Sequence, residues 1–248
     1  MLSYQMTKDQ INAINPDIAV IPVASLEQHG PHLPVNTDII IAEAYANGIS
    51  MELNAFQIPA VPISTCREHM GYKGTVWINP DTFYRMMIEI CMCLEEQGFK
   101  KIVIVQGHGG IFMLTPVIRE LNATRNPELQ VCRIDPGNYL EQFKNAGVIS
   151  SSAGLHADEF ETSIVQYLHG DLVHNELIQD FVPEVTRDYL NYGSIYCASP
   201  SGVWGQPSRA TAEKGGKLLE LGRKLMAEDI RKIFAYMNNK NPQGYGSF

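Results

Sequence analysis

One stretch in the middle of the chain alternates helices with buried strands, and this pattern constrains the fold more than any other feature. Asn79 and Pro80 begin a predicted helix, because asparagine is a frequent N-cap and proline is favoured at the first helical position. Apolar residues then recur at helical spacing from Phe83 to Leu94. The segments that follow are a buried strand over 101–105, a glycine-rich loop over 106–110, a helix over 112–122 and a strand over 129–134. This order is typical of a parallel α/β sheet.

The rest of the chain is compatible with the same architecture. A short apolar run over 17–23 predicts another strand, and the segment 154–168 predicts a loop that leads into an amphipathic helix. Residues 181–209 are rich in Pro, Gly, Ser and Tyr, which indicates long ordered loops, and 211–237 predict a closing helix. Because no linker-like segment and no block of charge divides the chain, we predict one α/β domain over residues 1–248.

The composition excludes several classes of protein. The chain has 19 lysine and arginine residues against 27 aspartate and glutamate residues, so no basic surface for nucleic acid is expected. No apolar run approaches the length of about 18 residues that a membrane span needs, and the N-terminal residues do not have the pattern of a signal peptide. We therefore expect a cytoplasmic globular protein without a membrane or nucleic-acid partner. Five cysteines are expected to be reduced and packed, namely Cys66, Cys91, Cys93, Cys132 and Cys197.

Three short segments concentrate the polar residues that metal binding and catalysis use. Glu27 and His29 lie two residues apart in the loop after the first predicted strand, and Asp38 follows nine residues after His29. His108 lies in the glycine-rich loop directly after the next buried strand, and the third segment, 156–163, reads HADEFETS. A hydrolytic site with two metal ions needs imidazoles, carboxylates and a bridging group, since the ions lie about 3.5–4 Å apart. The residues that would supply such a site are Glu27, His29, Asp38, His108 and Glu159.

Each of these residues also has a simpler interpretation. A glutamate in a loop is usually solvated, and Asp38 is placed equally well to cap a helix that starts at Ile39. Glu159 and Glu161 fall in the first turn of a predicted helix, where carboxylates complement the helix dipole. The glycines beside His108 are also compatible with nothing more than a tight turn. Three further histidines are expected at structural or surface positions, namely His32, His169 and His174.

Five motifs in order resemble the creatininase family, which comprises creatinine amidohydrolase and its relatives. An ordered set that spans nearly the whole chain is far more specific than any one of its members. The motifs are SLEQHGPHLPVNTD at 25–38, EHMGYKGT at 68–75, GHGG at 107–110, HADEFETS at 156–163 and SPSGVWGQPSRATAEKG at 199–215.

The resemblance implies a three-layer α/β/α fold with a mainly parallel central sheet, and hydrolysis of C–N bonds in amides, often cyclic ones. It also implies a site for two divalent metal ions, with zinc, manganese and iron all compatible, and a homo-oligomer that is commonly a hexamer. Matched residue by residue, Glu27 and His108 would bind one ion. His29 and Glu159 would bind the other ion, and Asp38 would bridge the two.

The same match gives two further roles and one departure from the family pattern. His156 would be the general acid/base beside the metals, and Glu161 would orient a metal ligand. Creatininase itself has a ligating carboxylate two residues after the histidine of its HG motif, where this chain has Gly110. Glu159 is therefore the candidate for the missing carboxylate, and the chain falls in a branch of the family that need not use creatinine.

The sequence thus predicts a metal-dependent amidohydrolase that acts on a small cyclic or formyl-type amide. Relatives that act on peptides or on ring ketones in sugar breakdown make a peptidase or a C–C hydrolase the alternative enzyme. A non-catalytic metal-binding relative is the alternative outside catalysis. Four aromatic residues are candidates for the pocket wall and equally for core or interface packing, namely Tyr72, Trp77, Tyr196 and Trp204.

Overall fold

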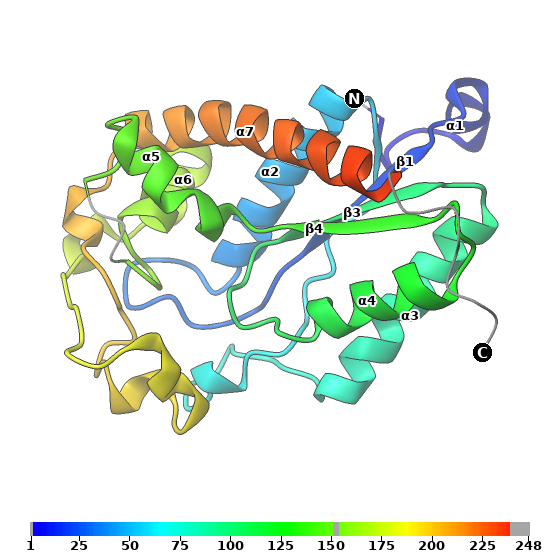
Figure 1. The fold of residues 1–248 in the computed structure, drawn as a ribbon. Coiled ribbons are helices and arrows are strands. Elements are labelled where there is room, and N and C mark those ends of the chain that lie inside the picture. Colours follow the sequence, from blue (N-terminus) through cyan, green and yellow to red (C-terminus); the bar gives the residue numbers. More distant parts are fainter. Residues whose placement is uncertain (1, 151–153, 239–248) are drawn as a thin grey trace.

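A parallel sheet of four strands forms the centre of the fold (Figure 1). The computed structural model describes residues 2–150 and 154–238. The strands are β1 (Ile18–Val23), β2 (Phe56–Gln57), β3 (Lys101–Gln106) and β4 (Gln130–Ile134), in the order β2-β1-β3-β4. Ala19 pairs with Ile102, and Ile102 pairs with Val131, which fixes the register of the three longer strands.

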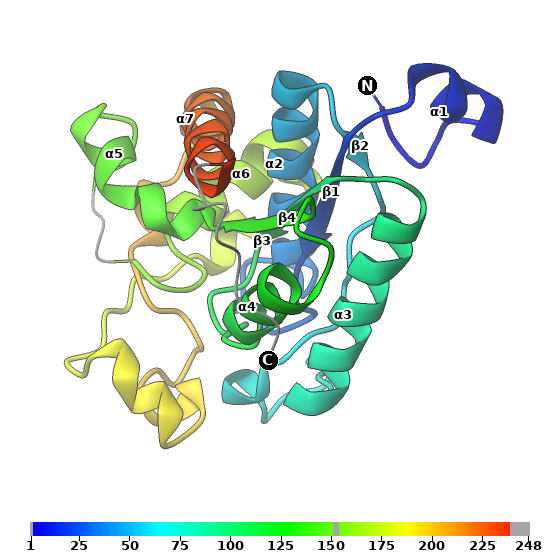
Figure 2. The same ribbon diagram turned by 45° about the vertical axis from the view of Figure 1, so that its right-hand side comes forward.

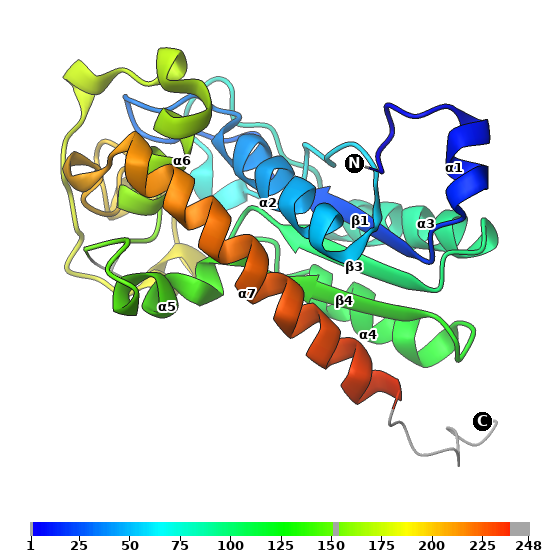
Figure 3. The ribbon, with the colours of Figure 1, turned by 90° about the horizontal axis from the view of Figure 1, so that it is seen from above.

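Helices cover both faces of this sheet, so the molecule has three layers (Figure 2). The helices are α1 (Lys8–Ile14), α2 (Thr37–Leu53), α3 (Pro80–Glu96), α4 (Leu114–Thr124), α5 (Leu140–Asn145), α6 (Glu159–His169) and α7 (Ala212–Asn238). Helices α2, α5, α6 and α7 pack on one face, and α3 and α4 pack on the other. Figure 3 shows the long helix α7 crossing above the sheet beside α2. The predicted three-layer α/β/α fold with a parallel sheet is confirmed.

Side chains of the central strands alternate between two hydrophobic cores. Val20 points into the core shared with α2, α6 and α7, whereas its neighbours Ala19 and Ile21 point into the core shared with α3 and α4. All three side chains are fully buried. Complete burial of a valine or isoleucine side chain contributes about 1.5–3 kcal/mol, so the paired strands form a rigid base for the loops at their carboxyl ends.

Several local expectations differ from the structure. Asp38 does not cap a helix, because α2 follows the N-cap Asn36 and Asp38 lies within its first turn. The segment 181–209 is not made of loops alone. It contains three short 3-10 helices, over 187–191, 195–197 and 207–209. All five cysteines are free, but Cys93 and Cys197 are exposed rather than packed.

The histidines expected outside the site lie where the sequence placed them. His169 is the last residue of α6 and is exposed, and His174 is also exposed. His32 is buried, and its Nε2 lies 3.0 Å from the hydroxyl of Thr162 on α6. No helix within residues 2–150 and 154–238 has the length and apolar character needed to cross a membrane.

Candidate metal centre

Loops at the carboxyl ends of β1 and β3 bring the polar segments of the sequence together. Residues 24–36 follow β1, residues 107–113 follow β3, and the segment 154–158 leads into α6 beside them. A 3-10 helix, η1 (Arg67–His69), adds a fourth piece from the long loop after β2. This is the edge at which parallel sheets commonly place their sites.

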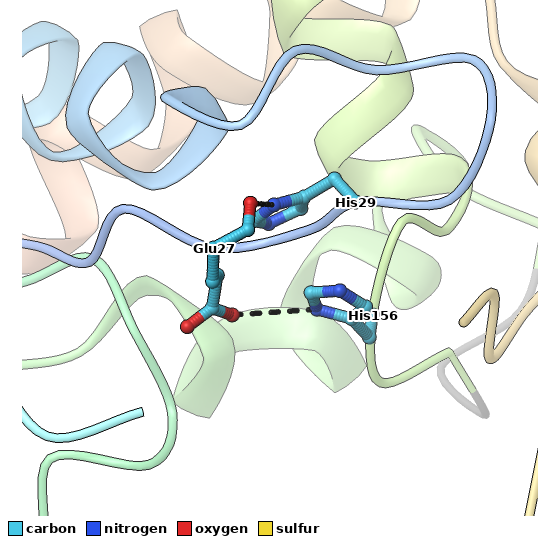
Figure 4. A group of neighbouring side chains, drawn as sticks. All are labelled: Glu27, His29 and His156. Atoms are coloured by element: carbon cyan, nitrogen blue, oxygen red, sulfur yellow. Dashed lines mark hydrogen bonds and ion pairs between the residues drawn. The ribbon is translucent and has the colours of Figure 1, made fainter. Parts of the chain in front are cut away.

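Glu27 and His29 lie in the loop after β1, and both side chains are buried (Figure 4). Nδ1 of His29 donates a hydrogen bond to the backbone carbonyl of Glu27 at 3.1 Å. Because a carbonyl oxygen only accepts, this bond leaves Nε2 of His29 facing Oδ1 of Asp38 at 3.0 Å. Histidines that bind metals are commonly held by a hydrogen bond from their other ring nitrogen. The side-chain carboxylate of Glu27 points the other way, toward His156 (Figure 4).

Asp38 joins the two sides of the cluster. Its Oδ1 faces His29, and its Oδ2 lies 3.4 Å from Nδ1 of His108. The close approach of Asp38 to the loop that carries His108 depends on Gly107. A Cβ at this position would stand 2.7 Å from the backbone carbonyl oxygen of Asp38 and 2.7 Å from the Cβ of Ala42. Glycine at 107 therefore lets the first turn of α2 pack against the loop after β3.

His108 and His69 lie beside the carboxylate of Glu27. Nδ1 of His108 is 3.1 Å and Nε2 of His69 is 3.2 Å from Oε1 of Glu27. The side-chain nitrogen of Gln28 lies 3.0 Å from Nδ1 of His69, while the side-chain oxygen accepts from the N–H of Gly30. The amide therefore donates to Nδ1 of His69, and Nε2 of that ring faces Glu27. His69 was not assigned from the sequence, although the Glu-His pair of the EHMGYKGT motif was a signal for it.

Glu161, and not Glu159, brings a carboxylate from α6 to the cluster. Oε2 of Glu161 lies 3.7 Å from Nε2 of His29, and Glu161 belongs to one of the groups with metal-ligand spacing. The carboxylate of Glu159 lies away from these groups and contacts Nζ of Lys214 at 2.6 Å. Residues two apart on a helix point about 200° apart, so both glutamates cannot face the same site. The sequence-based placement of Glu159 in the site is corrected accordingly.

His156 enters from the segment before α6 and lies between two other imidazoles. Its ring centroid is 4.2 Å from that of His29 and 4.2 Å from that of His69. Nε2 of His156 donates to the backbone carbonyl of Gln28 at 2.6 Å. This bond leaves the lone pair of Nδ1 free, and Nδ1 lies 3.7 Å from Oε1 of Glu27.

The backbone next to His156 is held in an uncommon conformation. Ala157 has a φ of 50°, which is unfavourable for a residue with a side chain. Its N–H donates to the carboxylate of Glu161, and His156 exchanges backbone hydrogen bonds with Trp204 at 3.2 and 2.9 Å. These contacts fix the direction in which the His156 ring points.

Burial and charge shift the pKa values of the clustered groups. Burial lowers the pKa of His29, but nearby carboxylates, Asp38 first among them, outweigh it and raise that pKa to about 10. Burial raises the pKa of Glu161 to about 8. Burial lowers the pKa of His156 and of His69, so both rings are neutral at pH 7. Titratable groups perturbed in this way concentrate at functional sites.

The cluster fits a divalent metal. Both carboxylate oxygens of Glu27 and Oδ2 of Asp38 are buried and form no hydrogen bond, although imidazole nitrogens lie 3.1–3.4 Å away. Buried carboxylate oxygens without partners are unfavourable, and a cation satisfies them. Mixed nitrogen and oxygen donors suit zinc, manganese or iron. Three groups have ligand atoms within 4.8 Å of one another: Glu27, His29 and His156; Glu27, His69 and His108; His29, Asp38 and Glu161.

A cavity of about 810 Å³ opens onto this cluster. His108, His156 and Glu161 line it, and its aromatic lining residues are Phe112 and Tyr192. The four aromatic residues suggested by the sequence are not among the lining residues of this cavity. Each of the four has a partner or is buried. The rings of Tyr72 and Tyr196 lie against each other at a tilt with centroids 4.5 Å apart, the guanidinium of Arg67 lies 6.0 Å from the ring centre of Trp77, and Trp204 is 5% exposed.

Comparison with known proteins identifies relatives over most of the chain. The model of one family, described as "Creatininase: Creatinine amidohydrolase", matches residues 4–230. The mycofactocin precursor peptide peptidase of Mycobacterium tuberculosis is 28% identical over 244 residues, which cover 93% of this chain and 90% of that protein. Creatinine amidohydrolase of Pseudomonas putida is 24% identical over 233 residues, covering 88% of this chain and 90% of that protein. The crystal structure of creatinine amidohydrolase (creatininase) has the same fold, with a TM-score of 0.80 at 21% identity and coverage of 94% and 98%.

Proposed function

The chain belongs to the creatininase family of hydrolases, and we propose that it cleaves a C–N bond of a small cyclic or formyl-type amide with the help of two divalent metal ions. The observation that carries the proposal is the buried cluster of imidazoles and unsatisfied carboxylate oxygens at the inner wall of a large cavity. Buried carboxylate oxygens beside imidazole nitrogens are the mixed donor set that divalent ions of this kind use.

Five side chains would hold the two ions. Glu27 and His108 would bind one of them, since Nδ1 of His108 and Oε1 of Glu27 lie 3.1 Å apart. His29 and Glu161 would bind the other. Asp38 would bridge the two ions, because its two oxygens face His29 and His108 separately. This set differs from the one suggested by the sequence only in the carboxylate taken from α6.

The chain's own residues have separate tasks in the proposed reaction. When bound, two such ions lower the pKa of water and polarise a carbonyl group. His156 is neutral and has a free lone pair on Nδ1, so it accepts a proton from the attacking water. The same nitrogen then donates that proton to the leaving nitrogen of the amide. The hydrogen bond from Nε2 of His156 to Gln28 keeps Nδ1 directed at the cluster throughout.

A substrate screen tests this proposal. Protein loaded with zinc, manganese or iron is incubated with cyclic and N-formyl amides, and product formation is followed by mass spectrometry. We expect hydrolysis that needs the metal, and we expect His156→Ala to keep its metal and lose about 10²–10⁴-fold in turnover. Full activity of His156→Ala, or of the metal-free protein, would contradict the proposal.

Peptide hydrolysis is the second candidate function. The peptidase of M. tuberculosis is 28% identical over 93% of this chain, and the cavity of about 810 Å³ has room for more than a single small ring. Short peptides should be included in the same screen. A kcat/KM for peptides well above that for every small amide would favour the peptidase.

We also propose that the chain forms a homo-oligomer, with a hexamer as the form that the family resemblance implies. The 3-10 helix η5 (Arg187–Asn191) and its C-terminal neighbour expose Tyr189 and Tyr192 at 58% and 84%. Large exposed aromatic side chains are frequent in protein interfaces. Light scattering measures the mass of the particle, and a monomer at micromolar concentration would rule out this part of the proposal.

A further inference from the structure

Glu68 places a carboxylate at the cavity wall that the five proposed metal ligands leave unexplained. It lies on η1 next to His69, and its side chain is 18% exposed among the residues that line the cavity. Its Oε1 lies 3.2 Å from Nε2 of His108, across 40 positions of sequence. Within the described ranges, its ion-pair partner is this histidine and not a lysine or arginine.

The two ring nitrogens of His108 face different surroundings. Nδ1 lies 3.1 Å from Oε1 of Glu27 and 3.4 Å from Oδ2 of Asp38, inside the cluster. Nε2 faces Glu68. Because a carboxylate oxygen accepts, Nε2–H donates to Glu68, and Nδ1 is the ring nitrogen that would face a divalent ion in the cluster. A carboxylate in this position fixes the tautomer of a ligand histidine and increases its basicity.

The space for Glu68 exists because residue 110 is glycine. A Cβ built on Gly110 would collide with Oε1 of Glu68 and with Nε2 of His108, which are the two atoms of this contact. The carboxylate and the glycine come from different loops, one after β2 and one after β3. Any side chain at 110 would therefore separate Glu68 from His108.

We propose that Glu68 is a positioning residue of the metal centre, which holds His108 so that Nδ1 is available to a divalent ion. Gly110 leaves the room for this contact. The inference rests on the proposed function, because it requires an ion at the cluster. It adds a residue that acts on the ion through His108 and so sets the affinity of the site.

Metal affinity is the direct test, measured by competition between the protein and a chelator for Zn²⁺ or Mn²⁺. Carboxylates that hold a ligand histidine typically contribute 10–100-fold in metal affinity. Glu68→Ala should therefore bind the metal about 10–100-fold more weakly. Glu68→Gln keeps an acceptor oxygen without the charge, so its loss should be smaller. The matched control is Glu95→Ala, because Glu95 is 13% exposed, bonds Arg125 at 2.8 Å and does not line the cavity.

Cobalt(II) loading separates positioning from direct ligation. If Glu68 acts through His108, Glu68→Ala keeps the intensity of the visible cobalt bands at saturation while its affinity falls. A saturated spectrum typical of a different coordination number would overturn the positioning role. If the wild-type protein binds metal and Glu68→Ala binds it with the same affinity, the inference is overturned as well. Wild-type protein that binds no metal would instead overturn the proposed function.

Discussion

Replacing Glu159 and Glu161 by glutamine, one at a time, distinguishes a residue that stabilises the fold from a residue that binds metal. The two residues lie in the first turn of α6, two positions apart. Both substitutions keep the shape of the side chain and remove one carboxylate. The structure nevertheless predicts opposite outcomes, because one side chain faces His29 and the other faces Lys214.

Glu159→Gln should destabilise the protein without changing its metal content. The carboxylate is 4% exposed and lies 2.6 Å from Nζ of Lys214, whose side chain is 26% exposed. Breaking a buried ion pair costs about 3–5 kcal/mol, whereas an exposed pair is worth about 0–1 kcal/mol. The amide oxygen of glutamine still accepts from the N–H of Ser150, now 2.9 Å from Oε2. Because Lys214 is partly solvated, we expect the free energy of unfolding to fall by about 1–3 kcal/mol, which lowers Tm by about 2–12 °C in a chain of this size.

Glu161→Gln should lose metal without a comparable loss of stability. Burial raises the pKa of Glu161 to about 8, so its side chain is mainly protonated in the metal-free protein at pH 7. Glutamine is a neutral substitute of the same shape and still accepts from the N–H of Ala157. We expect the free energy of unfolding of the metal-free protein to change by less than about 1 kcal/mol. One of the two proposed ions should be lost.

Elemental analysis and thermal melts of the metal-free proteins are enough to decide between these outcomes. Full metal content in Glu161→Gln would refute the assignment of this carboxylate to the site. Metal loss in Glu159→Gln at unchanged Tm would show that the helix presents the other glutamate, as the sequence alone suggested.

Three further predictions concern the same cluster. Metal binding at pH 7 should release roughly two to three protons, because ligands must be deprotonated. Against the lowering effect of burial, nearby carboxylates raise the pKa of His29 to about 10 and the pKa of His108 well above its usual value, and burial raises the pKa of Glu161 to about 8. Calorimetry in buffers of different ionisation enthalpy measures this release, and an absence of proton release would contradict the protonation states. In the metal-free protein the raised pKa of Glu161 contributes stability that is complete below about pH 4.5 and lost as the pH rises through about 8, so stability should fall less steeply in Glu161→Gln. Gly107→Ala should push Asp38 away and weaken metal binding, whereas Gly170→Ala, with open space around its Cβ, should leave metal binding unchanged.

The sequence was sufficient for the parallel sheet and for most of the cluster. The run of buried residues in β3 and the helix start at Asn79 are local signals, so they predicted elements within a few positions of those observed. Glu27, His29 and His108 follow strands directly, and the carboxyl ends of parallel strands necessarily meet at one edge. These placements needed no knowledge of packing.

The remaining site residues depend on contacts that no local pattern encodes. Glu159 and Glu161 both suited the first turn of a helix, and only the rotation of α6 against the sheet decides which one faces the cluster. Glu68 and His69 lie in a single turn of 3-10 helix that has no sequence periodicity, and they reach His108 across about forty positions of sequence. A motif marks such residues as a group, but their individual roles follow from the three-dimensional arrangement.

The metal content of protein purified without chelator tests the central claim most directly, with Asp38→Ala as the comparison. Asp38 is buried and faces His29 and His108 with different oxygens, so its loss should remove the bridge for both ions. We expect about two divalent ions per wild-type chain and nearly none in Asp38→Ala. Wild-type protein that binds no ion, even after loading with zinc or manganese, would contradict it.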